Sequence, residues 1–177
     1  MTKFLLSLKR SILISTLWTI SVYAQSPMLI LQQKLSAIHT MEAAFTQTIH
    51  AKHRVVSKSS GVMALARPDR FRWQTKHPMA QTVVADGKNL WIYDQELEQV
   101  SVSKQTRRLG AAGALFLSQD NEAVKRDFDL IAYHPGASEI FELRAKSHQS
   151  NFEQVRLVFK NERLSTIEMD DQLGQRT

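Results

Sequence analysis

The sequence contains no cysteine. This absence excludes disulfide bonds, catalysis by a thiol and metal sites built from thiolates. It also removes the residue that a bacterial lipoprotein needs directly after its signal segment. Any function of this chain must therefore come from its other side chains, from its backbone and from the shape that they build.

A strong excess of one charge is also lacking outside the N-terminal segment. The chain has 23 Lys and Arg against 17 Asp and Glu, a net charge of +6. Residues 1–24 hold three of the basic residues and no acid, which leaves residues 25–177 with a net charge of +3. No basic block alternates with stacking aromatic residues, so the composition argues against nucleic-acid binding.

Patterns for catalysis and for metal binding are missing as well. The six histidines form no HExxH motif, and His50 and His53 would fall on opposite faces of a strand. The sequence has no G-x-S-x-G elbow and no phosphate-binding loop. We therefore predict no enzyme activity, no metal site and no cofactor, which leaves binding as the expected kind of function.

Acidic residues are absent from the first 24 positions. The pattern of these positions predicts a secretory signal peptide. "MTKFLLSLKR" supplies positive charge, and "SILISTLWTI" is an apolar run too short to span a bilayer. Val22 and Ala24 occupy the −3 and −1 places of a cleavage site. We expect a mature chain from Gln25 in an extracytoplasmic compartment. The alternative is an uncleaved anchor helix.

The expected mature chain begins with one amphipathic helix and continues as a series of strands. In residues 26–39 the apolar positions recur at helical spacing, with Ser26 as a cap and Pro27 in the first turn. The alternation then changes to a period of two, with short connections, and predicts an antiparallel meander of roughly nine or ten strands. The predicted strand segments are 42–51, 61–68, 71–73, a hairpin over 81–94 with "DGKN" as its turn, 97–103, 128–134, 139–146, 152–159 and 164–171.

One segment, residues 107–126, interrupts the meander. It does not alternate, and its apolar residues can form a helical stripe loosened by Gly110 and Gly113. Each glycine costs about 1 kcal/mol in a helix relative to alanine, so such a helix depends on packing and suits a lid. An ordinary connecting helix is the alternative. A bent sheet and two one-sided helices predict that the helices cover the concave face. The pattern leaves open whether the interior is packed core or cavity.

Four segments in order resemble the outer-membrane lipoprotein carrier family of Gram-negative bacteria, the LolA type. The resemblance covers most of residues 28–173. The segments that carry it are "AAFTQ" (43–47), "GVMALARPDRFRW" (61–73), "QTVVADGKNLWIYD" (81–94) and "LEQV" (97–100).

This resemblance implies a mainly β fold, an unclosed antiparallel β-barrel or half-barrel covered by an α-helical lid. It also implies a periplasmic chaperone that binds the acyl chains of triacylated lipoproteins. An inner-membrane lipoprotein-releasing ABC transporter would supply this cargo, and an outer-membrane receptor lipoprotein would accept it. The missing cysteine favours the carrier over the receptor. We expect a monomer.

The resemblance also implies which residues hold the acyl chains. The concave strand faces and the cover would supply an apolar lining, although ordinary core packing is the alternative for each residue. The strand residues expected there are Phe45, Met63, Leu65, Phe71, Trp73 and Trp91, and the cover residues are Leu31, Leu35, Leu115 and Phe116.

In "ARPDRFRW", strand alternation would put Arg67 on the side of Phe71 and Trp73. A guanidinium facing an apolar interior needs acceptors, and helix ends carry unsatisfied carbonyls. In the family, the arginine of the Arg-Pro pair bonds to the backbone of the lid helices. Arg67 would thus be a latch that holds the lid shut, with Pro68 ending the strand. A solvent-facing arginine at the rim is the alternative. Phe71 matches a phenylalanine near the family's entrance that affects delivery.

The family continues beyond the last predicted strand into a helix and a final strand, whereas this sequence stops at Thr177. We therefore expect one domain over 25–177 that lacks both elements, with one sheet edge unpaired and part of the lid absent. Two other functions remain open. One is a regulatory module of the same fold that senses a lipid or lipoprotein. The other is a periplasmic lipid hydrolase, for which no nucleophile and histidine pair stands out.

Overall fold

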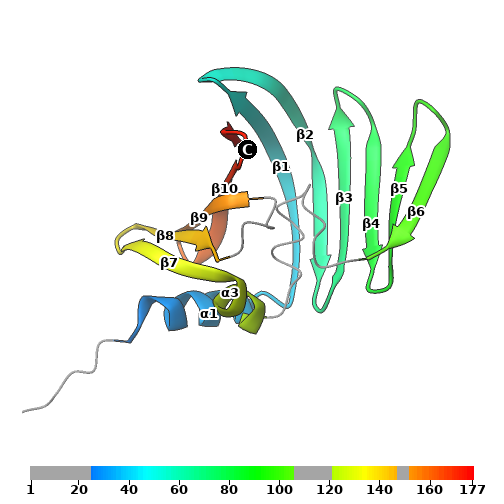
Figure 1. Cartoon of the computed structure of the whole chain (residues 1–177). Helices are drawn as coiled ribbons and strands as arrows, with labels where there is room; N and C mark the ends of the chain where they lie inside the picture. Colours follow the sequence, from blue (N-terminus) through cyan, green and yellow to red (C-terminus); the bar gives the residue numbers. More distant parts are fainter. Residues whose placement is uncertain (1–24, 106–120, 147–151) are drawn as a thin grey trace, which may run out of the picture.

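A single curved sheet dominates the molecule (Figure 1). The computed structural model describes residues 25–105, 121–146 and 152–177. Eleven antiparallel strands follow the order β6-β5-β4-β3-β2-β1-β11-β10-β9-β8-β7. The elements are α1 (Pro27–Ala37), β1 (Thr40–Ala51), β2 (Arg54–Ala66), β3 (Arg70–His77), β4 (Gln81–Asp86), β5 (Asn89–Asp94), β6 (Gln99–Lys104), α3 (Asn121–Asp127), β7 (Phe128–His134), β8 (Ser138–Ala145), β9 (Phe152–Lys160), β10 (Arg163–Asp171) and β11 (Gln175–Arg176).

The predicted fold class, a mainly β unclosed antiparallel barrel, is confirmed. In the described residues β6 and β7 are the two ends of the strand order, so the sheet bends without closing. Figure 1 shows two wings, β1–β6 and β7–β10, with α1 and α3 at one end of the space between them. Helix α1 contacts α3 and β7.

The β4–β5 hairpin shows how local chemistry produces the meander. Gly87 adopts a φ of 96°, which only glycine tolerates easily. The Asp86 carboxylate accepts hydrogen bonds of 2.7 Å from the backbone N–H groups of both Lys88 and Asn89. These bonds fix the turn, so the predicted "DGKN" hairpin is confirmed with Ala85 opposite Leu90.

Helix α1 begins where the sequence predicts. The hydroxyl of Ser26 accepts a hydrogen bond from the backbone N–H of Leu29 at 3.3 Å, and Pro27 occupies the first turn. The helix ends at Ala37, two residues before the predicted end, and the chain enters β1 at Thr40.

Two expectations differ from the described chain. The strand count is eleven rather than nine or ten, because the chain pairs once more in the two-residue β11. Of the helix expected over 107–126, the described part is α3, Asn121–Asp127. The rest of that segment, with Leu115 and Phe116, lies outside the described residues, as does the expected signal peptide.

Candidate functional site

The concave face of the β1–β6 wing is apolar. The register places Met63 opposite Trp73 and Leu65 opposite Phe71. Because side chains alternate across a strand, these four share one face. Met63, Leu65 and Phe71 are buried, and Trp73 is half-buried against them. Phe45 joins them from β1, where Ala43 lies opposite Met63.

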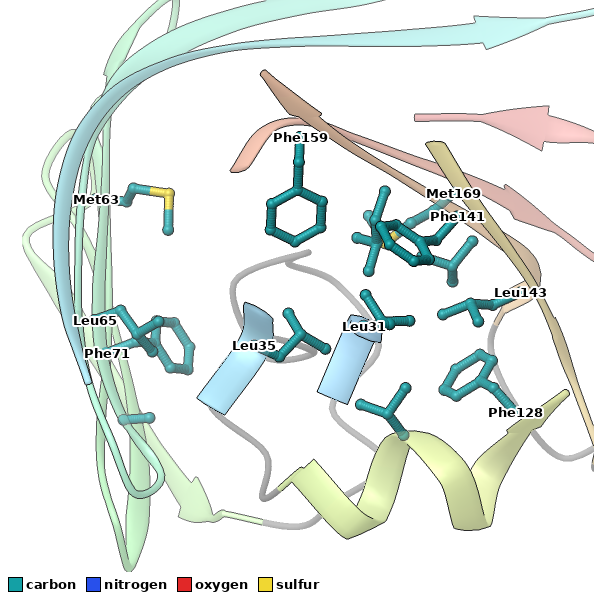
Figure 2. Close-up of a cluster of buried hydrophobic side chains, with 14 of the residues drawn as sticks. Leu31, Leu35, Met63, Leu65, Phe71, Phe128, Phe141, Leu143, Phe159 and Met169 are labelled. Atoms are coloured by element: carbon teal, nitrogen blue, oxygen red, sulfur yellow. The ribbon is translucent and has the colours of Figure 1, made fainter. Parts of the chain in front are cut away.

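Helix α1 inserts its apolar stripe into this concave face. Leu31 and Leu35 are 0% and 1% exposed. Figure 2 shows them between the two wings, with Leu65 and Phe71 on one side and Phe141 on the other. Fully burying a leucine side chain contributes about 1.5–3 kcal/mol, so these two residues account for much of the attachment of α1.

Beside this cluster lies a cavity of about 440 Å³. Phe45, Met63 and Trp73 line it from the β1–β6 wing, and Leu164 and Ile167 line it from β10. Its volume falls within the range of roughly 300–1,000 Å³ that is common for small-molecule pockets. The interior therefore combines a packed apolar cluster with adjoining free space.

Trp91 is the residue of the expected lining that the structure contradicts. The register pairs Val83 with Ile92 and Val84 with Trp91, and Val84 itself lies opposite Arg72. This parity puts Trp91 on the convex face, the opposite face from Trp73. There it is 40% exposed, and its indole N–H donates to the Asp86 carboxylate at 2.9 Å. Assigning Trp91 to the cavity lining was wrong.

Arg67 lies in the turn between β2 and β3, next to the cis peptide bond that precedes Pro68. Its side chain is half-buried, and its Nε atom is shielded from solvent. The backbone N–H of Arg67 donates to the carbonyl oxygen of His39 at 2.9 Å, directly after the end of α1. The turn that carries Arg67 is therefore bound to the segment that connects α1 to the sheet.

A charge cluster that the sequence did not reveal ties α1 to the other wing. The Lys34 ammonium lies 2.6 Å from the Glu139 carboxylate of β8 and 2.5 Å from that of Glu162 in the β9–β10 turn. The hydroxyl of Tyr133 donates to Glu139 at 3.0 Å. Lys34 and Glu139 are 11% and 18% exposed, whereas Glu162 is 81% exposed. The cluster holds α1 against the β7–β10 wing.

This arrangement shifts the pKa values of its members. The hydrogen bond from Lys34 lowers the pKa of Glu139 below its ordinary value, against the opposing effect of burial. Burial alone would lower the pKa of Lys34, but its bonds to Glu139 and Glu162 outweigh burial and raise it. Burial, then the bond to Glu139, raises the pKa of Tyr133. Lys34 and Glu139 therefore stabilise each other's charged forms.

The side chains around the cavity are mixed, with apolar residues next to Gln47, His50, Glu168 and Arg176. In the described ranges, His, Asp and Glu side chains form no group of three or more that could hold a metal ion. No helix among these residues combines the length and the apolar character needed to cross a membrane. Because most of the lining is apolar or hydroxyl-bearing, the cavity can accommodate hydrocarbon.

Comparison with known proteins gives one consistent result. The family model described as "Outer membrane lipoprotein carrier protein LolA" matches residues 36–177. The chain is 49% identical over 156 residues to an outer-membrane lipoprotein carrier protein of Legionella pneumophila, covering 88% of this chain and 77% of that one. It is 34% identical over 172 residues to the protein of that name in Pseudomonas putida, covering 95% and 83%.

A solved structure also resembles this chain, although more distantly. The crystal structure of a LolA superfamily protein from Nitrosomonas europaea aligns with a TM-score of 0.44 at 14% identity, over 83% of this chain and 73% of that one. The sequence relatives and the family model carry the assignment. On their evidence, the chain belongs to the LolA family of outer-membrane lipoprotein carrier proteins.

Proposed function

We propose that this protein is a periplasmic chaperone that carries the acyl chains of lipoproteins in its concave interior. It accepts a triacylated lipoprotein from an inner-membrane releasing ABC transporter and delivers it to an outer-membrane receptor lipoprotein. The observation that supports this function best is the apolar concave face covered by a helix, in a member of a lipoprotein carrier family.

Transport of an acyl chain through water requires a shield. Each methylene group left in water costs about 0.8 kcal/mol. In the structure, Leu31 and Leu35 of α1 fill the concave face. On loading, acyl chains replace these leucines against Leu65 and Phe71, so one apolar contact is exchanged for another. Exposure of the two leucines offsets part of the free energy gained by removing the acyl chains from water, which helps a carrier that must both accept and release cargo.

The remaining expected site residues belong to this proposal. Phe45, Met63 and Trp73 line the cavity between β1 and β10 and contact the cargo. Arg67 acts as the latch, because its turn contacts the segment after α1. Phe71, which is buried opposite Leu65, corresponds to the family's phenylalanine near the entrance and affects delivery.

Two tryptophans on opposite faces provide a matched test. Trp73→Ala removes a ring from the concave face, and Trp91→Ala removes one from the convex face. Titration with a synthetic triacylated lipopeptide, followed by displacement of an apolar fluorescent dye, gives the affinity of each variant. We expect Trp73→Ala to weaken binding by roughly tenfold or more, since aromatic truncation in an apolar site costs a few kcal/mol. Trp91→Ala should bind as the unchanged protein does.

Two results would contradict the carrier proposal. Equal affinities of the two variants would place the acyl chains elsewhere and defeat the carrier proposal. Mass spectrometry of the protein purified from periplasm adds an independent measurement. Co-purified intact lipoprotein supports a carrier, whereas release of free fatty acid from the lipopeptide would indicate a hydrolase.

A further inference from the structure

Strand β6 forms one outer end of the sheet (Figure 1), and β7 forms the other. The two ends differ in their cover, because helices α1 and α3 contact β7, whereas all six residues of β6 are exposed. Gln105, the residue after β6, bonds back into the same wing, to the carbonyl oxygens of Lys88 and Asp69, both at 2.8 Å. Among the described residues, β6 is therefore the more open edge.

The outer edge of β6 lacks features that usually protect such strands. Proteins block free edges with proline, with bulges, with charges along the strand or with covering segments. The sequence of β6, "QVSVSK", has no proline, and its one charge is Lys104 at the end. Its register with β5 is regular, whereas β1–β2 and β2–β3 each contain an irregularity. The edge is thus a regular template for another strand.

The hydrogen-bonding pattern shows which backbone groups of β6 face outwards. The N–H of Gln105 donates to the carbonyl oxygen of Lys88, in line with the β5–β6 register. Bonded pairs alternate with non-bonded pairs in an antiparallel ladder, so every second residue before Gln105, beginning with Ser103, bonds to β5. The bond from the N–H of Gln95 to the carbonyl oxygen of Ala80, between β5 and β4, has the same phase. The alternate residues of β6 therefore direct their N–H and C=O groups away from the sheet: Val100, Val102 and Lys104.

The side chains of these outward-bonding residues lie on the convex face. The register places Val102 opposite Trp91 and Val100 opposite Tyr93. These four side chains are between 39% and 57% exposed. They form an apolar patch that reaches the open edge of the sheet.

We propose that β6 is a self-association edge, through which two copies of this chain join their sheets. The two β6 strands would run antiparallel about a two-fold axis between their Ser101 residues. Val100 of each copy then lies opposite Val102 of the other. This inference does not depend on the carrier function, and it replaces the monomer expected from the sequence by a weak dimer.

Backbone and side chains together select this register. Residues with outward-facing backbone groups must lie opposite one another to form bonded pairs. Among the registers that satisfy this condition, the proposed one pairs both valines of each copy with valines of the other. A slide of two residues in either direction would put one valine opposite Glu98 or Lys104 instead. Pairs of β-branched side chains across two strands stabilise a sheet.

Charge favours the antiparallel arrangement as well. Glu98 directly precedes β6, and Lys104 ends it. When two copies pair antiparallel, Lys104 of each copy lies beside Glu98 of the other, at both ends of the joined strands. A second copy thus matches this edge in hydrogen bonding, in apolar side chains and in charge. A six-residue edge is a small interface, so the dimer should form only at high protein concentration.

Sedimentation equilibrium of the whole chain, from micromolar to millimolar concentration, tests the proposal. We expect a monomer that becomes a dimer as the concentration rises. Glu98→Lys and Lys104→Glu should each weaken dimerisation by roughly tenfold, because each change sets two pairs of like charges side by side. Combining the two changes restores opposite charges and should recover most of the affinity.

Two further measurements locate the interface. Val102→Lys places a charge in the middle of the edge and should abolish the dimer. Val56→Lys is the matched control, because Val56 is similarly exposed but lies on β2, away from β6. In the dimer, amide hydrogen exchange should slow by roughly tenfold or more at Val100 and Val102. Ser101, already bonded to β5, should change little.

Several outcomes would overturn the assignment. One is a chain that stays monomeric over the whole concentration range, and another is a double charge reversal that associates no better than the single ones. A dimer that leaves the amides of Val100 and Val102 unprotected would use a different surface. Protection of these amides already in the dilute monomer would show that the chain itself covers the edge.

Discussion

Phe45 of β1 stacks on Trp73 of β3, with ring centroids 3.8 Å apart and an interplanar angle of 29°. The two strands are not neighbours, because β2 lies between them. The rings meet over Gly61, the β2 residue opposite Phe45, since this position has no side chain. A Cβ atom added there would lie 2.9 Å from Phe45 Cε1 and 1.9 Å from the carbonyl oxygen of Gln74.

Gly61→Ala should therefore lower the free energy of unfolding by about 3 kcal/mol, the upper end of the usual cost of overpacking. The backbone of β3 cannot move away without distorting its pairing with β2. Urea denaturation followed by tryptophan fluorescence measures the loss. Ser60→Ala, a neighbouring change that adds no volume, should stay within about 0.5 kcal/mol of the unchanged protein. Equal stability of Gly61→Ala and Ser60→Ala would contradict the crowding seen at this position.

Lys34→Met should destabilise the protein by about 1.5–3 kcal/mol, the range for hydrogen bonds to charged groups. The change leaves the largely buried Glu139 carboxylate without its cation. Adding Glu139→Gln to Lys34→Met should restore part of the loss, because no uncompensated charge then remains. Glu162→Gln removes the exposed partner and should cost less than about 1 kcal/mol. Thermal unfolding of the four proteins at neutral pH would show this order. A loss from Glu162→Gln as large as that from Lys34→Met would refute it.

Asp86 gives the protein a defined response to acid. Hydrogen bonds from the Asn89 backbone, the Trp91 indole and the Lys88 backbone lower the pKa of Asp86 from 3.8 to about 2. A carboxyl group whose pKa is lower in the folded state stabilises the protein at pH values above its unfolded-state pKa. This contribution is lost as the pH falls through the folded-state pKa. The affected window is therefore about pH 4 to 2. Asp86→Asn should flatten the dependence of stability on pH within it.

Stability measured between pH 5 and 2 by denaturant titration checks this expectation. The difference between the two proteins isolates Asp86 from the other carboxylates. Trp91 fluorescence reports the same titration, because its indole bonds to the carboxylate. Parallel pH profiles for Asp86→Asn and the unchanged protein would show that these bonds do not favour the ionised form.

Arg67→Leu should leave a folded protein whose lid rests open. Loss of hydrogen bonds from a charged group corresponds to about 1.5–3 kcal/mol, a shift of roughly ten- to a hundredfold in the ratio of open to closed forms. Transfer of loaded lipoprotein to the receptor is the measurement, and it should be impaired. Arg70→Leu is the matched control, because Arg70 is exposed at the start of β3. Equal rates and yields for the Arg67→Leu variant and the unchanged protein would defeat the latch.

Local chemistry decides which parts of this structure could be predicted from the sequence. Asp86 and Gly87 specify a turn within four residues, so the hairpin was predictable. Trp91 was assigned to the wrong face because the assignment followed its aromatic side chain and not its position in the alternation of the strand. The parity of Trp91 depends on the register between β3 and β4, which their connecting turn sets. The Lys34–Glu162 pair joins residues 128 positions apart, and no local pattern reports such a contact.

The unjoined ends β6 and β7 have a mechanical consequence. In a closed barrel, widening the interior would break the main-chain hydrogen bonds between two neighbouring strands. Here, in the part of the chain that the structure describes, the ladder can stay whole while its two halves spread apart. Enlargement then costs bending and some side-chain contacts. The same fold can therefore widen its interior for bound molecules of different size without losing secondary structure.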